Sequence, residues 1–237
     1  MNLVEALIVW LTDPEHWVGA SGVPNRLLEH VVLSGAALAI ATAIAIPAGI
    51  YVGHTGRGVA LSANAANIGR ALPSLAVIAI VLPITAAFDN QAGFKVYPTL
   101  IAMIVLAIPP ILVNTQTGVR EVDRDLVEAG RAMGMRPGQV IRGLELPLAA
   151  PAIVIGLRSA AVQVIATATL GAIFGGGGLG RYLVEGIAQR NIGMTFAGVV
   201  LVGVLALAAE GAFAGVARLI RSPGLARMDQ SRAAAAP

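Results

Sequence analysis

The sequence predicts an all-α integral membrane protein with five transmembrane helices, and three observations lead to this fold class. Hydrophobic residues make up 57% of the 237 residues and charged residues only 12%, with a mean hydropathy of +0.80. A soluble domain has roughly 45–50% apolar and about 25% charged residues. Several apolar runs reach the ~20 residues that a helix needs to cross a hydrocarbon core of ~30 Å. Finally, the basic residues are distributed unequally between the two sides that five such helices define.

Five runs of sequence qualify as spans. They cover residues 31–53, 59–83, 96–119, 148–172 and 194–217. The first and third contain no charged residue, whereas the others each include one: Arg70, Arg158 or Glu210. An arginine at the centre of a bilayer costs roughly 2.5–3.5 kcal/mol on insertion scales, so both arginines are expected to face protein or water. The prolines within the runs should kink or end their helices: Pro47, Pro73, Pro83, Pro109 and Pro110.

The positive-inside rule places the amino terminus outside the cell and the carboxyl terminus in the cytoplasm, because loops rich in Lys and Arg stay in the cytoplasm. In that orientation ten basic residues lie in cytoplasmic segments: Arg57, Arg120, Arg124, Arg131, Arg136, Arg142, Arg218, Arg221, Arg227 and Arg232. Four lie in outer segments: Arg26, Lys95, Arg181 and Arg190. The sequence therefore predicts a multi-pass protein of the cell (cytoplasmic) membrane.

Two terminal segments flank the predicted transmembrane domain, residues 27–221. Residues 1–26 are expected to lie outside the cell and to include a short amphipathic helix, with Trp10 and Trp17 at the membrane interface. This segment has no basic n-region and its apolar core is too short to span, so a cleaved signal peptide is not expected. Residues 222–237 are small and polar without periodicity, which is typical of a disordered tail.

The residue types for several kinds of chemistry are missing. The chain has no cysteine, which removes thiolate metal sites and thiol catalysis. Its three histidines have no metal-ligand spacing, so neither a metal site nor a catalytic residue is predicted. The glycine run 175–180, GGGGLG, lacks the Lys-Ser/Thr of a phosphate loop and is predicted to be a flexible turn. Basic and aromatic residues do not interleave as on a nucleic-acid surface. The chain is thus expected to hold no cofactor and no nucleic acid, and its energy must come from a partner or a gradient.

A polar segment, residues 120–147, lies between the third and fourth spans. Leu126–Met133 contains helix-forming residues, and Gly134 is suited to end this helix in a left-handed conformation. Pro137 suits the first turn of a second short helix that ends at Leu144, and Pro147 is expected to start the fourth span. Two short helices joined by a glycine corner should therefore project into the cytoplasm.

This polar segment resembles the EAA loop of ATP-binding-cassette importer permeases. That loop has the pattern E-A-A, three residues, G, nine residues, I-x-L-P. The matching residues here are Glu128, Ala129, Gly130, Gly134, Leu144, Leu146 and Pro147. The spacing agrees throughout, with two departures in residue type: Gly130 replaces alanine and Leu144 replaces isoleucine. The resemblance implies the core of a type I importer permease, in which this loop is the cytoplasmic coupling helix that docks on an ATPase subunit.

Other parts of the chain resemble osmoprotectant permeases, which import glycine betaine, choline, carnitine or proline betaine. They include YVGHTGRG at 51–58, NIGRALPSLA at 67–76 and AVQVIATATLGAIFGGGGLGRYL at 161–183. The resemblance implies a small-molecule importer with a second permease chain, identical or paralogous, and two ATPase subunits that bind ATP and Mg²⁺. It also implies an extracytoplasmic substrate-binding protein. Because the sequence ends in SRAAAAP without a fused binding domain, that protein is expected to be separate.

Residues for a substrate path are less sharply marked. Aromatic residues are only 4% of the chain, so selectivity for a quaternary ammonium is expected on the binding protein. Small polar residues could line a hydrated path, but hydrogen bonds between helices are the favoured interpretation for each of them: Ser74, Thr85, Asn114, Gln163, Thr167 and Thr169. Arg70, next to Pro73, could brace a kink, and Arg158 could pair with Glu210 or with a partner subunit. Bracing is favoured over a place in the path, because a fixed cation would repel a cationic cargo.

Three other interpretations fit part of these observations. An importer of the same architecture for methionine, phosphonate or sulfonate would share the loop and differ in cargo. A gradient-driven secondary transporter would need no ATPase, but no inverted repeat is visible and intramembrane acids are few. A membrane scaffold that transports nothing would need no coupling loop. The sequence therefore favours the permease subunit of an ATP-driven osmoprotectant importer.

Overall fold

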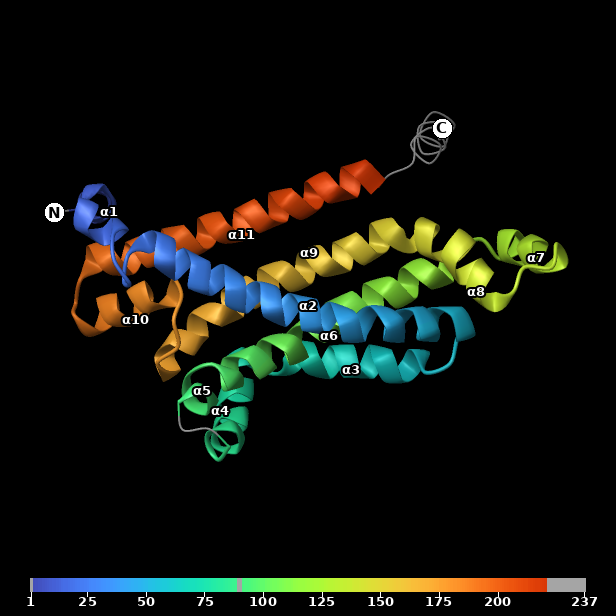
Figure 1. Cartoon of the computed structure of the whole chain (residues 1–237), viewed down its shortest axis with the longest axis horizontal. Helices are drawn as coiled ribbons and strands as arrows, with labels where there is room; N and C mark the ends of the chain where they lie inside the picture. Colours follow the sequence, from blue (N-terminus) through green and yellow to red (C-terminus); the bar gives the residue numbers. More distant parts are fainter. Residues whose placement is uncertain (1, 89–90, 221–237) are drawn as a thin grey trace.

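Long helices that run along a common axis form the body of the protein (Figure 1). The computed structural model describes residues 2–88 and 91–220, apart from the side chain of Arg70, so the tail 222–237 lies outside the described residues. Four helices are long and apolar enough to cross a membrane: α2 (Val23–Thr55), α6 (Tyr97–Arg120), the continuous helix Pro137–Phe174 that includes α9 (Leu146–Gly171), and α11 (Ile192–Ile220). A fifth crossing is formed if the bent pair α3 (Val59–Ala71) and α4 (Ser74–Ala86) is one span. No strand occurs within the described ranges.

The core of the body lies where α2, α6 and α9 pack against one another. Each helix contributes buried residues at every fourth position: Ala37, Ala41 and Ala45, then Met103, Ala107 and Ile111, then Ala160, Val164 and Ala168. The stripe on α2 continues in Gly49 and Gly53, where an added Cβ would lie 2.7 Å from the Cβ atoms of Thr115 and Val119, respectively. Residues four apart lie on one face of a helix, and small ones allow two backbones to approach closely, as helices in lipid require.

The second pass, predicted as one span over residues 59–83, is broken at Pro73, one of the prolines predicted to kink or end its helix. The axes of α3 and α4 meet at 93°. The break falls at Leu72 (ψ 123°) and Pro73 (ψ 126°), which are both extended. A residue before proline is disfavoured in the helical region, and proline has no N–H to continue the hydrogen-bond ladder. The remaining prolines of the predicted spans lie inside uninterrupted helices: Pro47 in α2, Pro83 in α4, and Pro109 and Pro110 in α6.

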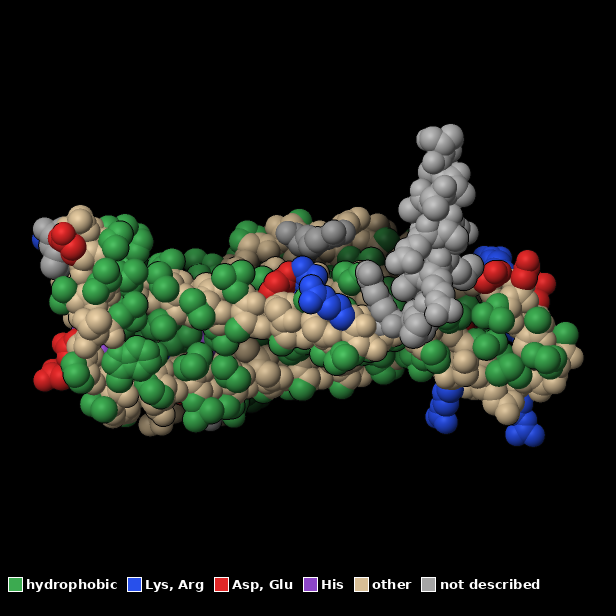
Figure 2. All heavy atoms as spheres, turned by 90° about the horizontal axis from the view of Figure 1, so that it is seen from above, with side chains coloured by type: hydrophobic (Ala, Val, Ile, Leu, Met, Phe, Trp, Pro, Cys, Tyr) green, Lys and Arg blue, Asp and Glu red, His purple; other side chains and the backbone are tan. Residues whose placement is uncertain are grey.

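The connections between the long helices gather at two opposite ends (Figure 1). The α1 end carries α1 (Leu3–Thr12), the 3₁₀ turn Pro14–Trp17, α5 (Ala92–Lys95) and α10 (Gly180–Ala188). The α7 end carries α7 (Arg124–Ala132) and α8 (Pro137–Val140). In Figure 2, charged side chains lie mainly at these two ends, and hydrophobic side chains cover much of the length between them. This distribution matches a hydrocarbon belt between two aqueous faces.

At the α1 end, α1 packs against α10 and α11 through a second apolar cluster. Trp10 is only 5% exposed, stacks on His16 with ring centroids 4.1 Å apart, and meets Tyr182 edge-on. Trp10 therefore lies in a protein core and not at the membrane interface expected from the sequence, while Trp17 is 44% exposed. Burial raises the pKa of Tyr182 to about 12, so its hydroxyl stays protonated and donates to the Ser21 carbonyl at 2.6 Å.

The glycine run 175–180 is held against α2, whereas a flexible turn was predicted. The N–H of Gly178 donates to Glu29 Oε2 at 2.8 Å, and the N–H of Leu179 donates to His30 Nδ1 at 3.2 Å. Because His30 Nδ1 accepts, Nε2 carries the proton and donates to the carbonyl of Ile165 at 3.1 Å. A Cβ at Gly177 would collide with the Glu29 carboxylate. The glycines are therefore needed for a close approach between the loop and α2.

Candidate functional site

The corner between α7 and α8 is built around Gly134. Its φ of +87° lies in the left-handed region, as the sequence predicts, and a Cβ added there would meet nothing within 4 Å. The N–H of Gly134 donates to the carbonyl of Arg131 at 2.9 Å, and the N–H of Met135 donates to that of Gly130 at 3.1 Å. These are the two hydrogen bonds of a Schellman motif. Glycine is required here by the backbone angle and not by crowding.

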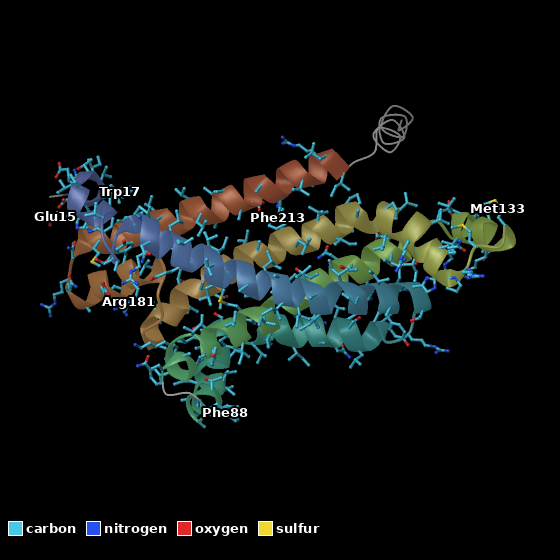
Figure 3. The ribbon with its side chains drawn as sticks, viewed as in Figure 1. Glu15, Trp17, Phe88, Met133, Arg181 and Phe213 are labelled. Atoms are coloured by element: carbon cyan, nitrogen blue, oxygen red, sulfur yellow. The ribbon has the colours of Figure 1, made fainter. Side chains whose placement is uncertain are left out.

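The first helix of the corner begins two residues earlier than predicted. Asp123 accepts a hydrogen bond from the N–H of Asp125 at 2.9 Å and caps α7 at its amino end. Glu128 and Ala129 are exposed on α7, while Gly130 is buried. Met133, at the last turn, is 79% exposed and lies at the tip of the molecule in Figure 3. An exposed apolar side chain at the end of a projecting helix is suited to contact another protein.

The two departures from the EAA pattern are in contact with each other. A Cβ added to Gly130 would lie 2.9 Å from Leu144 Cδ1 and 3.0 Å from Met135 Sδ. Leu144 and Met135 thus occupy the space that an alanine methyl group would need. The substitutions at positions 130 and 144 are therefore linked by packing.

The second helix of the corner does not stop before the fourth span, which differs from the sequence prediction. α8 continues through a π-helical turn, η2 (Ile141–Glu145), directly into α9, so that Pro137–Phe174 forms one helix of 38 residues. Pro147 is the second residue after this turn, and the Leu146 N–H donates to the Ile141 carbonyl. The missing N–H and the ring of a proline disturb the preceding turn of a helix, and a π-turn accommodates this without a break.

A contact distant in sequence joins this turn to α2. His54 Nδ1 lies 2.8 Å from both carboxylate oxygens of Glu145. The side chains of His54 and Glu145 are 14% and 6% exposed, respectively. Both residues line a cleft of about 580 Å³ together with Arg120, Arg124 and Glu128. The last turn of α2, the end of α6, α7 and η2 therefore share one polar cleft at the α7 end.

A second cleft, of about 350 Å³, lies along the body between α3, α6 and α9. Its polar side chains are Asn114, Ser159 and Gln163, and the prolines Pro109 and Pro110 also line it. Asn114 Nδ2 donates to the Pro110 carbonyl at 2.8 Å, which leaves its side-chain oxygen as an acceptor. No charged side chain lines this cleft among the residues that the structure describes.

The other predicted path residues lie elsewhere. Thr85 Oγ1 donates to the Gly93 carbonyl at 2.6 Å and so joins α4 to α5. Thr167 and Thr169 each bond a carbonyl of α9 itself, those of Gln163 and Ala166. Ser74 begins α4 beside Pro73 at the break of the second pass. The side chain of Arg70 lies outside the described part of the chain.

Arg158 of α9 and Glu210 of α11 form an ion pair, one of the two pairings that the sequence allowed for Arg158. Twelve residues separate Arg158 from the start of α9, and ten separate Glu210 from the end of α11, or about 18 Å and 15 Å along the helices. These distances place the pair near the middle of a core ~30 Å thick. The side chains are 43% and 34% exposed in the single chain.

Several residues of these sites were not predicted as site residues, among them His54, Met133, Glu145 and Ser159. His54 was interpreted as a basic anchor at the membrane surface, and Glu145 occupies the unspecified position of the L-x-L-P match. No local signal links them, because 91 residues separate them. A signal for Met133 was available, since an apolar residue directly before a predicted glycine corner must lie at its tip.

Comparison with known proteins identifies relatives over most of the chain. A family model described as binding-protein-dependent transport system inner membrane component matches residues 45–231. The choline transport system permease protein OpuBB of Bacillus subtilis (strain 168) is 33% identical over 205 residues, covering 86% of this chain and 91% of that protein. The carnitine transport permease protein OpuCB of Listeria monocytogenes is 35% identical over 182 residues, with coverages of 77% and 80%.

Solved structures show the same architecture. An inward-facing conformation of the MetNI methionine ABC transporter, from the native crystal form, matches with a TM-score of 0.73. The match covers 89% of this chain and 100% of that chain at 23% sequence identity, so it identifies the fold. The all-α fold of a type I importer permease, as predicted from the sequence, is confirmed.

Proposed function

The chain belongs to the family of binding-protein-dependent transport system inner membrane components, and on this premise we propose that it is the permease subunit of an ATP-driven importer for osmoprotectants of the quaternary ammonium class. Relatives that align over most of both chains are named for the transport of choline, glycine betaine and carnitine. The methionine transporter shares the fold at only 23% identity, which gives no support for methionine as cargo. A gradient-driven transporter is not favoured, because the family works with binding proteins.

Residues 120–147, which we call the coupling segment, dock on one of two ATPase subunits that bind ATP and Mg²⁺. The observation that carries this proposal is the single helix Pro137–Phe174, which continues from the Gly134 corner into the membrane. Its 38 residues span about 57 Å. A displacement of α7 by nucleotide-driven closure of the ATPases would therefore reach the membrane interior through one rigid rod. In this arrangement the α7 end faces the cytoplasm and the α1 end faces the separate substrate-binding protein.

The cleft along α3, α6 and α9 forms part of the substrate path, and a second permease chain completes it. Asn114, Ser159 and Gln163 offer neutral polar groups, and no described lining residue is charged. Such a lining lets an organic cation pass without holding it tightly. We propose that primary selectivity lies with the binding protein and that this chain itself holds no cofactor.

The Arg158–Glu210 pair braces α9 against α11. An isolated charge at this depth is costly, whereas an ion pair that faces protein or water is tolerated. The partial exposure of both side chains in the single chain supports cover by the second permease chain or by water in the path.

Reconstitution of the full complex in liposomes tests the proposed function. We expect the binding protein loaded with choline, glycine betaine, carnitine or proline betaine to stimulate ATP hydrolysis and to drive uptake of that solute. The binding protein loaded with methionine is the control and should stimulate neither. Uptake driven by a proton or sodium gradient without ATP would contradict the proposal.

A further inference from the structure

The contact between His54 and Glu145 is a well-defined link between the coupling segment and the first span. His54 lies in the last turn of α2, and Glu145 lies in the π-helical turn between α8 and α9. His54 Nδ1 is 2.8 Å from each carboxylate oxygen. The other ion pairs and histidine–carboxylate contacts of the described residues lie outside residues 120–147, so among them this contact alone joins that segment to another long helix.

The burial of Glu145 makes this contact hard to give up. Glu145 is 4% exposed and is the one buried carboxylate within the described ranges. A buried carboxylate without a hydrogen-bond donor carries a large desolvation cost. Any rearrangement of the α7 end is therefore more favourable if His54 and Glu145 stay together than if they separate.

Each partner is fixed to a different rigid element. Glu145 belongs to the continuous helix Pro137–Phe174, which begins directly after the corner. His54 belongs to α2, which packs along α6 and α9 through the stripe of small residues and ends at Gly56 with φ +70°. When the helix that carries Glu145 moves, the end of α2 must follow it or the contact must break.

We propose that His54 is a positioning residue for energy coupling: through Glu145 it makes the cytoplasmic end of the first span move as one body with the coupling segment. The inference rests on the proposed function and assigns His54 and Glu145 a role beyond anchoring the chain at the membrane surface. The pair does not touch the substrate or the nucleotide. Its effect is on how much transport each hydrolysis event produces.

Variants at position 54 test this role in the reconstituted complex. For His54→Ala we expect ATP hydrolysis stimulated by the loaded binding protein to continue, with substrate transported per ATP reduced roughly fivefold or more. His54→Gln should retain most coupling, because its amide can still donate to the Glu145 carboxylate. Arg57→Ala, an exposed change at the same end of α2, is the matched control and should leave the ratio unchanged.

The outcomes separate this inference from the proposed function. A wild-type complex that neither hydrolyses ATP in response to the loaded binding protein nor transports would refute the proposed function. A wild-type complex that does both, with an unchanged transport-to-ATP ratio in His54→Ala, would refute only the role of His54.

A cysteine pair provides an answer even if His54→Ala fails to assemble. The permease has no native cysteine, so the double variant His54→Cys with Glu145→Cys carries the only two thiols of this chain. We expect poor coupling in its reduced form, and recovery when a short bifunctional thiol-reactive cross-linker, such as a bis-methanethiosulfonate, bridges the two thiols, because the contact between the native side-chain ends leaves the Cβ atoms too far apart for a direct disulfide. An active reduced form that bridging inactivates would show that the two positions must separate, and would overturn the inference.

Discussion

Single residues at the α7 end act through backbone angle and packing, and Gly134 is the clearest case. At φ +87° with open space around it, the position is sensitive to backbone strain and insensitive to side-chain volume. We expect Gly134→Val to destabilise the corner by about 1–3 kcal/mol and to reduce transport, because a β-branched residue is strained in this region. Gly134→Asn is the matched control, since asparagine tolerates the left-handed conformation. The measurement is substrate uptake by assembled complexes that carry each variant. Equal uptake by the two variants would count against the corner as a rigid lever.

The contact between Gly130 and Leu144 leads to a prediction about paired substitutions. Gly130→Ala gains helix propensity, but part of that gain should be lost, because its Cβ would lie 2.9 Å from Leu144 Cδ1 and this side chain must shift. Leu144→Ile should restore part of the loss, since alanine and isoleucine stand together in the EAA pattern. A double-mutant cycle on thermal unfolding should show a coupling energy of about 0.5 kcal/mol or more. Simple additivity would mean that positions 130 and 144 do not share this packing space.

At this scale the local backbone conformation could be predicted from the sequence, whereas contacts between residues distant in the sequence could not. The left-handed Gly134 followed from the position of glycine after a helical run. The His54–Glu145 contact did not, because it depends on how α2 packs against α9. The pairing of Arg158 with Glu210 was foreseen as one of two possibilities, since two opposite charges in apolar spans have few other partners.

At the scale of helices, the packing of α2 depends on its stripe of small residues. Gly49→Ala places a Cβ 2.7 Å from Thr115 Cβ and 3.0 Å from the Leu112 carbonyl, so α2 and α6 must move apart. Such overpacking costs about 1–3 kcal/mol and should lower the melting temperature of the purified complex. Gly35→Ala in the same helix is the control, because nothing lies within 4 Å of its added Cβ. Equal melting temperatures for the two variants would contradict close packing at the stripe.

Helix positions followed from hydropathy, but helix ends and breaks depended on neighbours. The predicted span 31–53 lies inside α2, which extends beyond the apolar run because helix hydrogen bonding continues into polar residues. The predicted span 96–119 agrees with α6 to within one residue at each end. Proline alone did not indicate which helix would break: α3 and α4 separate at Pro73, whereas α6 runs through Pro109 and Pro110. The glycine run 175–180 was taken for a flexible turn because Glu29 and His30, its partners, lie about 150 residues away.

For the whole molecule, the central claim is that the α7 end is a cytoplasmic lever and the α1 end faces outward. Apart from the Arg158–Glu210 pair, the charged side chains lie mainly at the two ends, and the helix Pro137–Phe174 leads from the corner into the membrane (Figure 1). Fold class and family could be obtained from sequence because hydropathy and the EAA spacing are local properties. The lining of the cleft proposed as part of the substrate path could be predicted only in part, because Ser159 joins Asn114 and Gln163 through the packing of α6 against α9.

Cysteine cross-linking at the tip of α7 tests this claim most directly. Met133→Cys introduces a single exposed thiol into a chain without cysteine, and Gln189→Cys places one at the α1 end as the control. We predict that Met133→Cys cross-links to the ATPase subunit and is protected from a membrane-impermeant thiol reagent added outside intact cells, whereas Gln189→Cys reacts with that reagent and does not cross-link to the ATPase. Labelling of Met133→Cys from outside, or cross-linking of the ATPase to Gln189→Cys and not to Met133→Cys, would contradict the account.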